Sequence, residues 1–178
     1  MKNYIILLRG VMPMGKNKVP MAKLREVLTQ AGFENTRTYI ASGNALVNSD
    51  LPAGEIEQAV HELIKKHIGA DLVVIVRTGD QLQAILDNNP FTGGYDISRV
   101  FFTTFTAVPD TQKAKELMAM DFSPEELVIT ENAAYMYVPG NAARSKLSNL
   151  MLEKQLGVSA TTRNFNTMSK LIALSKEH

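Results

Sequence analysis

The chain has 178 residues, enough for one large domain or two small ones, and its 45% hydrophobic and 21% charged residues are typical of a folded globular protein. It contains no cysteine, which excludes a disulfide framework, a thiolate zinc site and a cysteine nucleophile. The apolar run at residues 4–8 is too short for a signal peptide or a membrane span, so we expect a soluble, cytoplasmic protein with no membrane partner.

The formal net charge of +1 is unevenly distributed along the chain. Residues 1–33 hold six basic residues and one acidic residue, and residues 141–178 hold six basic and two acidic ones. The net charges of these ends are therefore +5 and +4, against −8 for the middle. Such a distribution attracts an anionic partner to the ends, although solvated faces can produce the same pattern.

In the first half, an apolar strand at residues 4–8 is followed by a loop and by a helix that starts at Pro20 and ends at Gly32. Segments 38–40 and 45–47 predict a β-hairpin around the turn 41–44. The pattern then predicts three more elements: a helix over 56–68, a strand over 72–76, and a helix capped by Thr78 or Asp80 that ends at residue 86.

The second half repeats this order after a loop around Gly93 and Gly94. Its predicted elements are a strand at 100–106, a helix at 110–120 capped by Asp110 or Thr111, strands at 127–130 and 135–138, a helix at 144–156, a strand at 161–163 and a helix from Asn166 or Thr167 to residue 175. Each half therefore has the order of a split βαβ, ferredoxin-like unit. We predict an α+β fold of duplicated ferredoxin-like units with mostly antiparallel sheets and helices packed on them, in lobes 1–90 and 95–178.

The loop after the first strand contains a partial match to a nucleotide-binding motif. Gly10 to Lys16 fits the G-x-x-x-x-G-K spacing of a P-loop. Asn17 replaces the Ser or Thr that binds Mg²⁺, Pro13 removes an amide donor, and Pro20 starts the helix too late. The sequence therefore does not predict a nucleotide-hydrolysing P-loop.

The same loop is nevertheless the first candidate site. Backbone amides near Gly10 and Gly15, together with Arg9, Lys16 and Lys18, could hold a phosphate, carboxylate or sulfate. The alternative is that the glycines only permit tight turns and that the lysines point into water.

Two further segments carry candidate residues. The segment from Asn164 to Lys170 contains the start of the last predicted helix, at Asn166 or Thr167, where anions are attracted and where Arg163 and Lys170 add charge; plain N-capping is the favoured explanation of its Asn and Thr residues. A hairpin turn explains the segment from Ser42 to Asn44, since catalysis by a serine would need a base that is not evident. The complete set of candidate ligand-binding residues is Arg9, Gly10, Gly15, Lys16, Asn17, Lys18, Ser42, Asn44, Arg163, Asn164, Asn166 and Lys170.

No catalytic residue, metal ligand or cofactor is predicted. His61 and His67 are six residues apart on one predicted helix, which is not the i, i+4 spacing of a metal-binding pair. The sequence does not decide whether the protein is an enzyme.

Four blocks of sequence resemble the bacterial family called domain of unknown function 1697: residues 7–10, 15–21, 38–44 and 162–167. The loop of that family usually reads RGINVGGKNKVPM, whereas this chain has Val11-Met12-Pro13-Met14 in place of INVG, and Phe165 stands where tryptophan is usual. The resemblance implies a two-lobed α+β fold and brings no established activity, cofactor or partner.

Our first hypothesis is a binding module for a small anionic or nucleotide-like ligand. Arg9, Lys16 and Lys18 would hold this ligand with help from Arg163 and Asn164, which requires the two ends of the chain to meet.

Three alternatives remain open. The first is an enzyme that acts on a phosphorylated or carboxylated metabolite, with Lys16 or Arg9 stabilising charge. The second is single-stranded nucleic-acid binding, in which Tyr39 and Phe165 would stack on bases. The third is a homo-oligomeric interaction module that uses an exposed sheet edge. The oligomeric state is not predicted.

Overall fold

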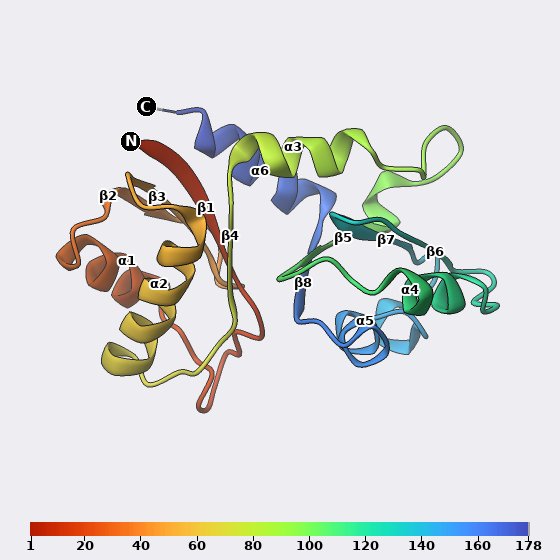
Figure 1. The fold of residues 1–178 in the computed structure, drawn as a ribbon, viewed down its shortest axis with the longest axis horizontal. Coiled ribbons are helices and arrows are strands. Elements are labelled where there is room, and N and C mark those ends of the chain that lie inside the picture. Colours follow the sequence, from red (N-terminus) through yellow and green to blue (C-terminus); the bar gives the residue numbers. More distant parts are fainter. Residues whose placement is uncertain (178) are drawn as a thin grey trace. The chain divides into compact units, whose positions relative to one another are not determined.

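The computed structural model describes residues 1–177. It contains two four-stranded antiparallel sheets with helices packed on them, which confirms the predicted α+β fold of duplicated ferredoxin-like units (Figure 1). The chain divides into two compact units, here called unit 1 (Met1–Leu82 and the segment from Lys170 onward) and unit 2 (Gln83–Ser169). The predicted lobes 1–90 and 95–178 stay a prediction.

Unit 1 follows the predicted element order. Its strands and helices are β1 (Lys2–Leu8), α1 (Met21–Gln30), β2 (Glu34–Thr38), β3 (Asn44–Ser49), α2 (Ala53–His67), β4 (Val74–Arg77) and the start of α3 (Gly79–Asp87). The sheet has the order β2-β3-β1-β4 with β1 antiparallel to both β3 and β4, which is the ferredoxin-like arrangement.

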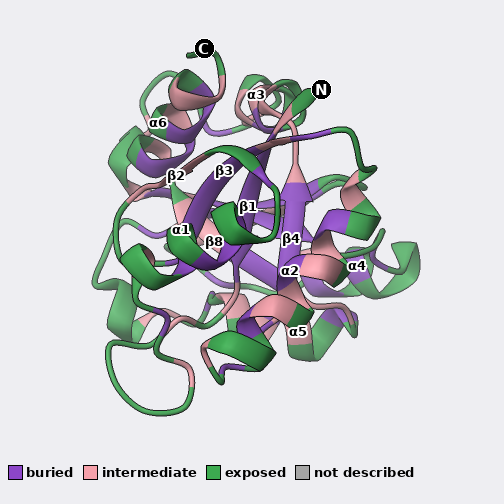
Figure 2. Ribbon diagram, turned by 90° about the vertical axis from the view of Figure 1, so that its left-hand side faces the viewer, coloured by how far each residue is buried: buried purple, intermediate pink, exposed green. Residues whose placement is uncertain are grey.

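The core of unit 1 lies between one face of this sheet and helices α1 and α2. Alternate residues of β1, Tyr4, Ile6 and Leu8, are buried in one cluster with Leu24 of α1 and Ile56 of α2. Figure 2 shows β1, β3 and β4 mostly buried and the outer faces of α1 and α2 exposed. Each fully buried aliphatic side chain contributes about 1.5–3 kcal/mol to the free energy of folding. Leu8, Val11 and Val19 pack in or against this cluster, so the core holds the end of β1 and both ends of the following loop in place.

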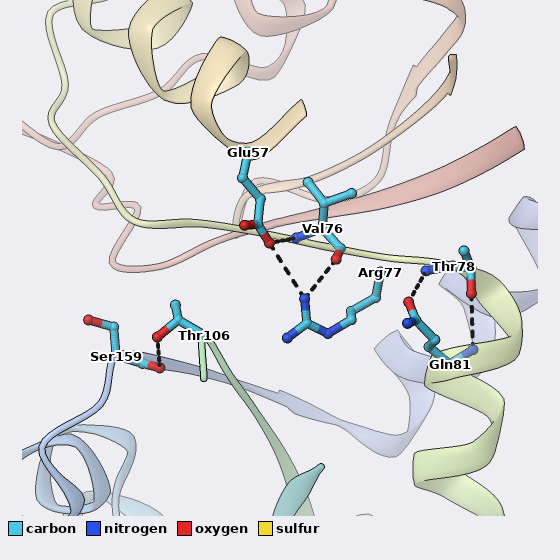
Figure 3. Close-up of polar contacts among 7 residues, drawn as sticks. All are labelled: Glu57, Val76, Arg77, Thr78, Gln81, Thr106 and Ser159. Carbon is cyan, nitrogen blue, oxygen red and sulfur yellow. Dashed lines mark hydrogen bonds and ion pairs between the residues drawn. The ribbon is translucent and has the colours of Figure 1, made fainter. Parts of the chain in front are cut away.

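Local capping fixes several helix starts. Helix α1 begins at Met21, so Pro20 is its N-cap and not its first residue as predicted. At α3, Thr78 and Gln81 form a reciprocal capping box: the N–H of Gln81 donates to Thr78 Oγ1 at 3.2 Å, and the N–H of Thr78 donates to Gln81 Oε1 at 2.9 Å (Figure 3). Thr78 is thus the cap that the sequence left undecided.

Unit 2 repeats the arrangement of unit 1. Its elements are η1 (Ile97–Arg99), β5 (Val100–Phe105), α4 (Thr111–Met118), β6 (Glu126–Ile129), β7 (Ala133–Tyr137), η2 (Ala142–Arg144), α5 (Asn149–Leu156), β8 (Ala160–Asn164) and the start of α6 (Phe165–Ser175). The sheet order is β6-β7-β5-β8. Asp110 accepts a hydrogen bond from the N–H of Lys113 and caps α4, as predicted.

Helix α3 covers the second face of the sheet in unit 2. Ala134 and Met136 point into the cluster under α4 and α5, so Tyr135 between them points to the opposite face. There the hydroxyl of Tyr135 donates to the carbonyl of Ile85 at 2.7 Å, and the Tyr135 ring lies 5.8 Å from that of Phe102. This face is therefore part of the protein interior.

Two predicted boundaries are wrong. Strand β2 ends at Thr38 instead of starting there, because Ile40 has a left-handed φ of 49° that a strand cannot continue. Helix α5 begins at Asn149, not at Arg144. The carboxylate of Glu125, 20 residues earlier, accepts a hydrogen bond from the hydroxyl of Ser145 and holds this segment outside the helix.

Within residues 1–177, no helix has the length and apolar character needed to cross a membrane.

Candidate functional site

The loop between β1 and α1 is closed on itself by backbone hydrogen bonds. The N–H of Met12 donates to the carbonyl of Asn17 at 2.9 Å, and the N–H of Lys18 donates to the carbonyl of Gly15 at 3.3 Å, which makes 15–18 a tight turn. Gly15 has a φ of 86°, which this turn requires and glycine adopts at low cost. The loop therefore has a defined shape at the end of the sheet (Figure 1).

The turn 15–18 presents positive charge and hydrogen-bond donors to solvent. Gly15, Lys16 and Lys18 are exposed, and Asn17 is half-buried. Among the hydrogen bonds of residues 1–177, none uses the N–H of Lys16 or of Asn17 as donor. Successive N–H groups next to a left-handed residue, with ammonium groups on either side, are the donors that anion-binding loops use.

The start of helix α1 adds to the positive potential of this region. Its N-cap is Pro20, which has no side chain that could accept a hydrogen bond from the helix, and no acidic residue lies in the first turn. The first N–H groups of a helix carry a partial positive charge, and Lys23 lies in this first turn. The segment 15–23 thus combines cations with the positive end of a helix.

The hairpin turn between β2 and β3 lies directly against the beginning of the loop. The N–H of Leu8 donates to the carbonyl of Gly43 at 2.9 Å. A β-carbon built on Gly43 would lie 2.6 Å from Val11 Cγ2 and 2.9 Å from Leu8 Cβ, and Gly43 has a φ of 94°. The structure therefore brings the turn that contains Ser42 together with the loop that starts at Arg9, although they are more than thirty residues apart.

Asn44 holds the hairpin turn. It is fully buried, and its Nδ2 donates to the carbonyl of Tyr39 and to Ser42 Oγ, both at 3.1 Å. The N–H of Tyr39 in turn donates to the carbonyl of Asn44 at 3.0 Å. These bonds give Asn44 a structural role in the turn, and its role as a ligand stays a prediction.

The second predicted segment is built around Arg163 in unit 2. Its Nη1 donates to Thr161 Oγ1 at 2.6 Å and to the carbonyl of Thr162 at 3.0 Å. Burial lowers the pKa of Arg163 to about 10, so the guanidinium remains a cation at neutral pH. Arg9 belongs to unit 1, and a shared site for Arg9 and Arg163 stays a prediction.

The other residues of this segment lie at the start of α6. Asn164 Oδ1 accepts a hydrogen bond from the N–H of Thr167 at 2.9 Å, so the segment is N-capped as the sequence favours, but the cap is Asn164 and the helix begins at Phe165 instead of Asn166 or Thr167. Asn166 and Lys170 are exposed.

Sequence reasoning missed Arg77, which holds the same position in unit 1 as Arg163 in unit 2. Arg77 pairs with Ile5, three residues before β1 ends, and Arg163 pairs with Phe102, three residues before β5 ends. Each arginine donates Nη1 to the carbonyl of the preceding residue, Val76 at 2.8 Å or Thr162 at 3.0 Å. The signal was present, since the last strand of each half of the sequence runs into an arginine.

A carboxylate accompanies Arg77. Glu57 Oε1 lies 3.5 Å from Arg77 Nη1 and accepts a hydrogen bond from the N–H of Val76 at 2.9 Å (Figure 3). Burial lowers the pKa of Arg77, and the charge of Glu57 opposes this effect. Glu57 thus stabilises a partly buried cation and occupies a donor on the edge strand β4.

Metal ligands do not cluster in the part of the chain that the structure describes: residues 1–177 contain no group of three or more His, Asp or Glu side chains that could hold a metal ion.

Comparisons with known proteins give a family and a fold. A family model described as "Protein of unknown function (DUF1697)" matches residues 1–135. The solved structure titled as conserved bacterial protein SP0830 from Streptococcus pneumoniae is similar over 98% of both chains, with a TM-score of 0.76 and 23% sequence identity. At this identity the likeness concerns the fold alone. No curated protein matches the sequence.

Proposed function

The chain belongs to the DUF1697 family of proteins of unknown function, and we propose that this member binds a small ligand through a phosphate or carboxylate group at residues 9–18. The observation that carries the proposal is the turn 15–18, where Lys16 and Lys18 flank N–H groups that donate no hydrogen bond within residues 1–177. The proposal concerns binding and assigns no reaction.

The architecture around the turn supports a preformed site. The loop is closed by its own hydrogen bonds, and its first residues are held against Gly43. A ligand therefore does not have to order the loop, and less of the interaction energy is lost on binding. Phosphate and carboxylate oxygens accept hydrogen bonds from amides and ammonium groups, and these bonds are stronger than bonds between neutral groups.

A small ligand agrees better with the structure than a single-stranded nucleic acid. Ferredoxin-like proteins that bind RNA stack bases on aromatic residues of the open sheet face. In unit 2 that face carries Tyr135 and Phe102, which are buried, and Tyr135 is hydrogen-bonded to α3. Phe165 is half-buried, with its ring 6.4 Å from that of Phe102. These rings are parts of the core and offer no platform for bases.

The sheet edges also argue against pairing with a second copy through β4 or β8. Glu57 accepts the hydrogen bond of the Val76 N–H on β4. On β8, Glu153 Oε2 accepts from the N–H of Ala160 at 3.0 Å, and the carbonyl of Ala160 accepts from Asn149 Nδ2 at 2.9 Å. Edge groups that are already bonded to side chains are protected against intermolecular pairing.

The test is a ¹⁵N NMR titration of the full chain with inorganic phosphate. We expect the amide signals of residues 15–18 to shift with saturation, and the Lys16→Ala/Lys18→Ala double variant to lose at least about tenfold in affinity. The control is the Lys66→Ala/Lys115→Ala double variant, which removes the same charge from exposed helix positions on α2 and α4.

The control variant should keep the affinity of the original chain. If both double variants lose affinity equally, only net charge attracts the anion and the proposed site is wrong. Phosphate-induced shifts that avoid residues 15–18 would exclude it as well.

A further inference from the structure

We propose that the hairpin turn Tyr39–Asn44 forms a second wall of the loop site and makes it select organic anions with an apolar group next to the charge, such as aryl phosphates. This inference rests on the anion site proposed for residues 9–18. It names the chemical class of the ligand and a residue that determines specificity, Ile40.

Ile40 has an unusual backbone conformation. Its φ is 49°, and among the described residues only Asn35 shares a positive φ without being glycine. Asparagine tolerates this conformation, but a β-branched residue there is a strained outlier. A glycine or asparagine would adopt this conformation with less strain. Backbone strain of this kind is often found at functional sites.

The side chain of Ile40 is exposed to solvent, with 48% of its surface accessible. The strained conformation therefore does not place Ile40 in the core, where burial would offset its cost. It presents a branched apolar group at the surface of a turn whose other residues, Gly43 and Asn44, are tightly held.

The facing loop also exposes apolar side chains. Met12 and Met14 are 53% and 80% accessible, and Met12 directly follows Val11, whose Cγ2 contacts the turn at Gly43. Methionine is flexible and adapts to ligands of varied shape. The loop and the turn, which meet at Val11 and Gly43, thus both carry exposed apolar groups, and the loop also carries the cations Lys16 and Lys18.

Ser42 adds a directed hydrogen-bond donor to this wall. Its Oγ accepts a hydrogen bond from Nδ2 of the buried Asn44 at 3.1 Å, which leaves the hydroxyl proton for a different acceptor. Ser42 is exposed, so this acceptor can belong to a ligand. An anion oxygen is an acceptor of the required kind.

The combination of charges and apolar groups defines the occupant. Two lysines, two amide donors and a hydroxyl suit one phosphate or carboxylate, while three apolar side chains suit a group the size of one ring. Inorganic phosphate would use only the polar half of this surface. An aryl phosphate would use both halves, because its ring can cover apolar surface that water now contacts.

The experiment compares phenyl phosphate with inorganic phosphate by NMR titration of the full chain and of Ile40→Gly. The original chain should bind phenyl phosphate about tenfold more tightly, which corresponds to the burial of a few carbon atoms. Ile40→Gly should bind inorganic phosphate unchanged and should lose most of the preference for phenyl phosphate.

Thermal unfolding of Ile40→Gly separates specificity from damage to the fold. Glycine accepts a positive φ without strain, so the melting temperature should be unchanged or higher. Val108→Ala removes another exposed apolar side chain, in unit 2, and should leave both affinities unchanged. Met14→Gln keeps the side-chain length and should reduce the preference for phenyl phosphate over inorganic phosphate.

The outcomes distinguish the two proposals. If neither ligand binds, the anion site itself is wrong. If both bind with equal affinity, or if Ile40→Gly weakens both by the same factor, the anion site stands and the selection by the hairpin turn is wrong.

Discussion

Gly43 and Val11 approach so closely that a β-carbon on Gly43 would lie 2.6 Å from Val11 Cγ2. This contact joins the hairpin turn of β2 and β3 to the first residues of the loop that follows β1. It fixes the position of the loop relative to the sheet, and it explains why the turn has glycine between Ser42 and Asn44.

Gly43→Ala should destabilise the protein by about 2–4 kcal/mol, because alanine adds both a clash with Val11 and strain at a φ of 94°. Urea unfolding measures this loss. Gly54→Ala is the matched control: Gly54 lies in the first turn of α2 with nothing within 4 Å of its added β-carbon, so the variant should be as stable or more stable. Equal stability of Gly43→Ala and the original chain would contradict the contact.

The edge of β4 offers a second prediction. Glu57→Ala leaves the N–H of Val76 and the guanidinium of Arg77 without this acceptor, and should reduce the free energy of unfolding by about 2 kcal/mol. Glu57→Gln keeps an oxygen for Val76 and removes only the charge, so it should cost about half as much. Glu62→Ala, at an exposed position of the same helix, should change stability little. If Glu57→Gln costs as much as Glu57→Ala, the charge and not the edge hydrogen bond dominates.

Tyr135→Phe tests the contact between β7 and α3. Loss of the hydrogen bond to the carbonyl of Ile85 should cost about 1 kcal/mol at neutral pH. Burial raises the pKa of Tyr135, so its stabilising contribution is complete below the pKa of about 10 in the unfolded chain and is lost as pH rises through the folded value. The stability of Tyr135→Phe should therefore fall less steeply above about pH 10 than that of the original chain. Tyr39→Phe, at a half-buried position of the hairpin turn, serves as the control in the same denaturant series.

Asp71 provides a prediction at acidic pH. The hydrogen bond from His61 at 2.7 Å, and next the charge of Lys65, hold the pKa of Asp71 below its ordinary value of 3.8. A lowered pKa means that the stabilisation is present above 3.8 and disappears as pH falls through the folded value. Asp71→Asn should therefore be slightly less stable than the original chain at pH 6, and this small difference should vanish at the acid end of the titration. If the stability difference persists at acidic pH, the charge of Asp71 is not its cause. The control is Glu131→Gln, at an exposed loop position, which should give no pH-dependent difference in stability.

The sequence predicted the repeated element order because apolar periodicity and capping residues act within one helix or hairpin. Pro20 before α1, Asp110 at α4 and Asn164 at α6 are local signals of this kind, and the structure has helix starts at each of them. The two ferredoxin-like units follow from that order.

Interactions between distant residues explain part of what the sequence did not reveal, since Glu125 delays the start of α5 from 20 residues away. The left-handed φ of Ile40, which ends the hairpin strand early, is unusual for a β-branched residue and so could not be expected from its sequence. Glu57 could be recognised as the partner of Arg77 only after α2 and β4 had been placed side by side.

For the candidate site, the sequence alone determined the residue types: a loop with two glycines and two lysines, a serine–glycine–asparagine turn, and an arginine in the last strand of each half. Only the tertiary structure decided that the turn touches the loop at Gly43 and that Asn44 is buried while Lys16 and Lys18 are exposed. The physical reason is that burial and close approach depend on how strands pair across the sheet, and this pairing joins residues that no local pattern connects.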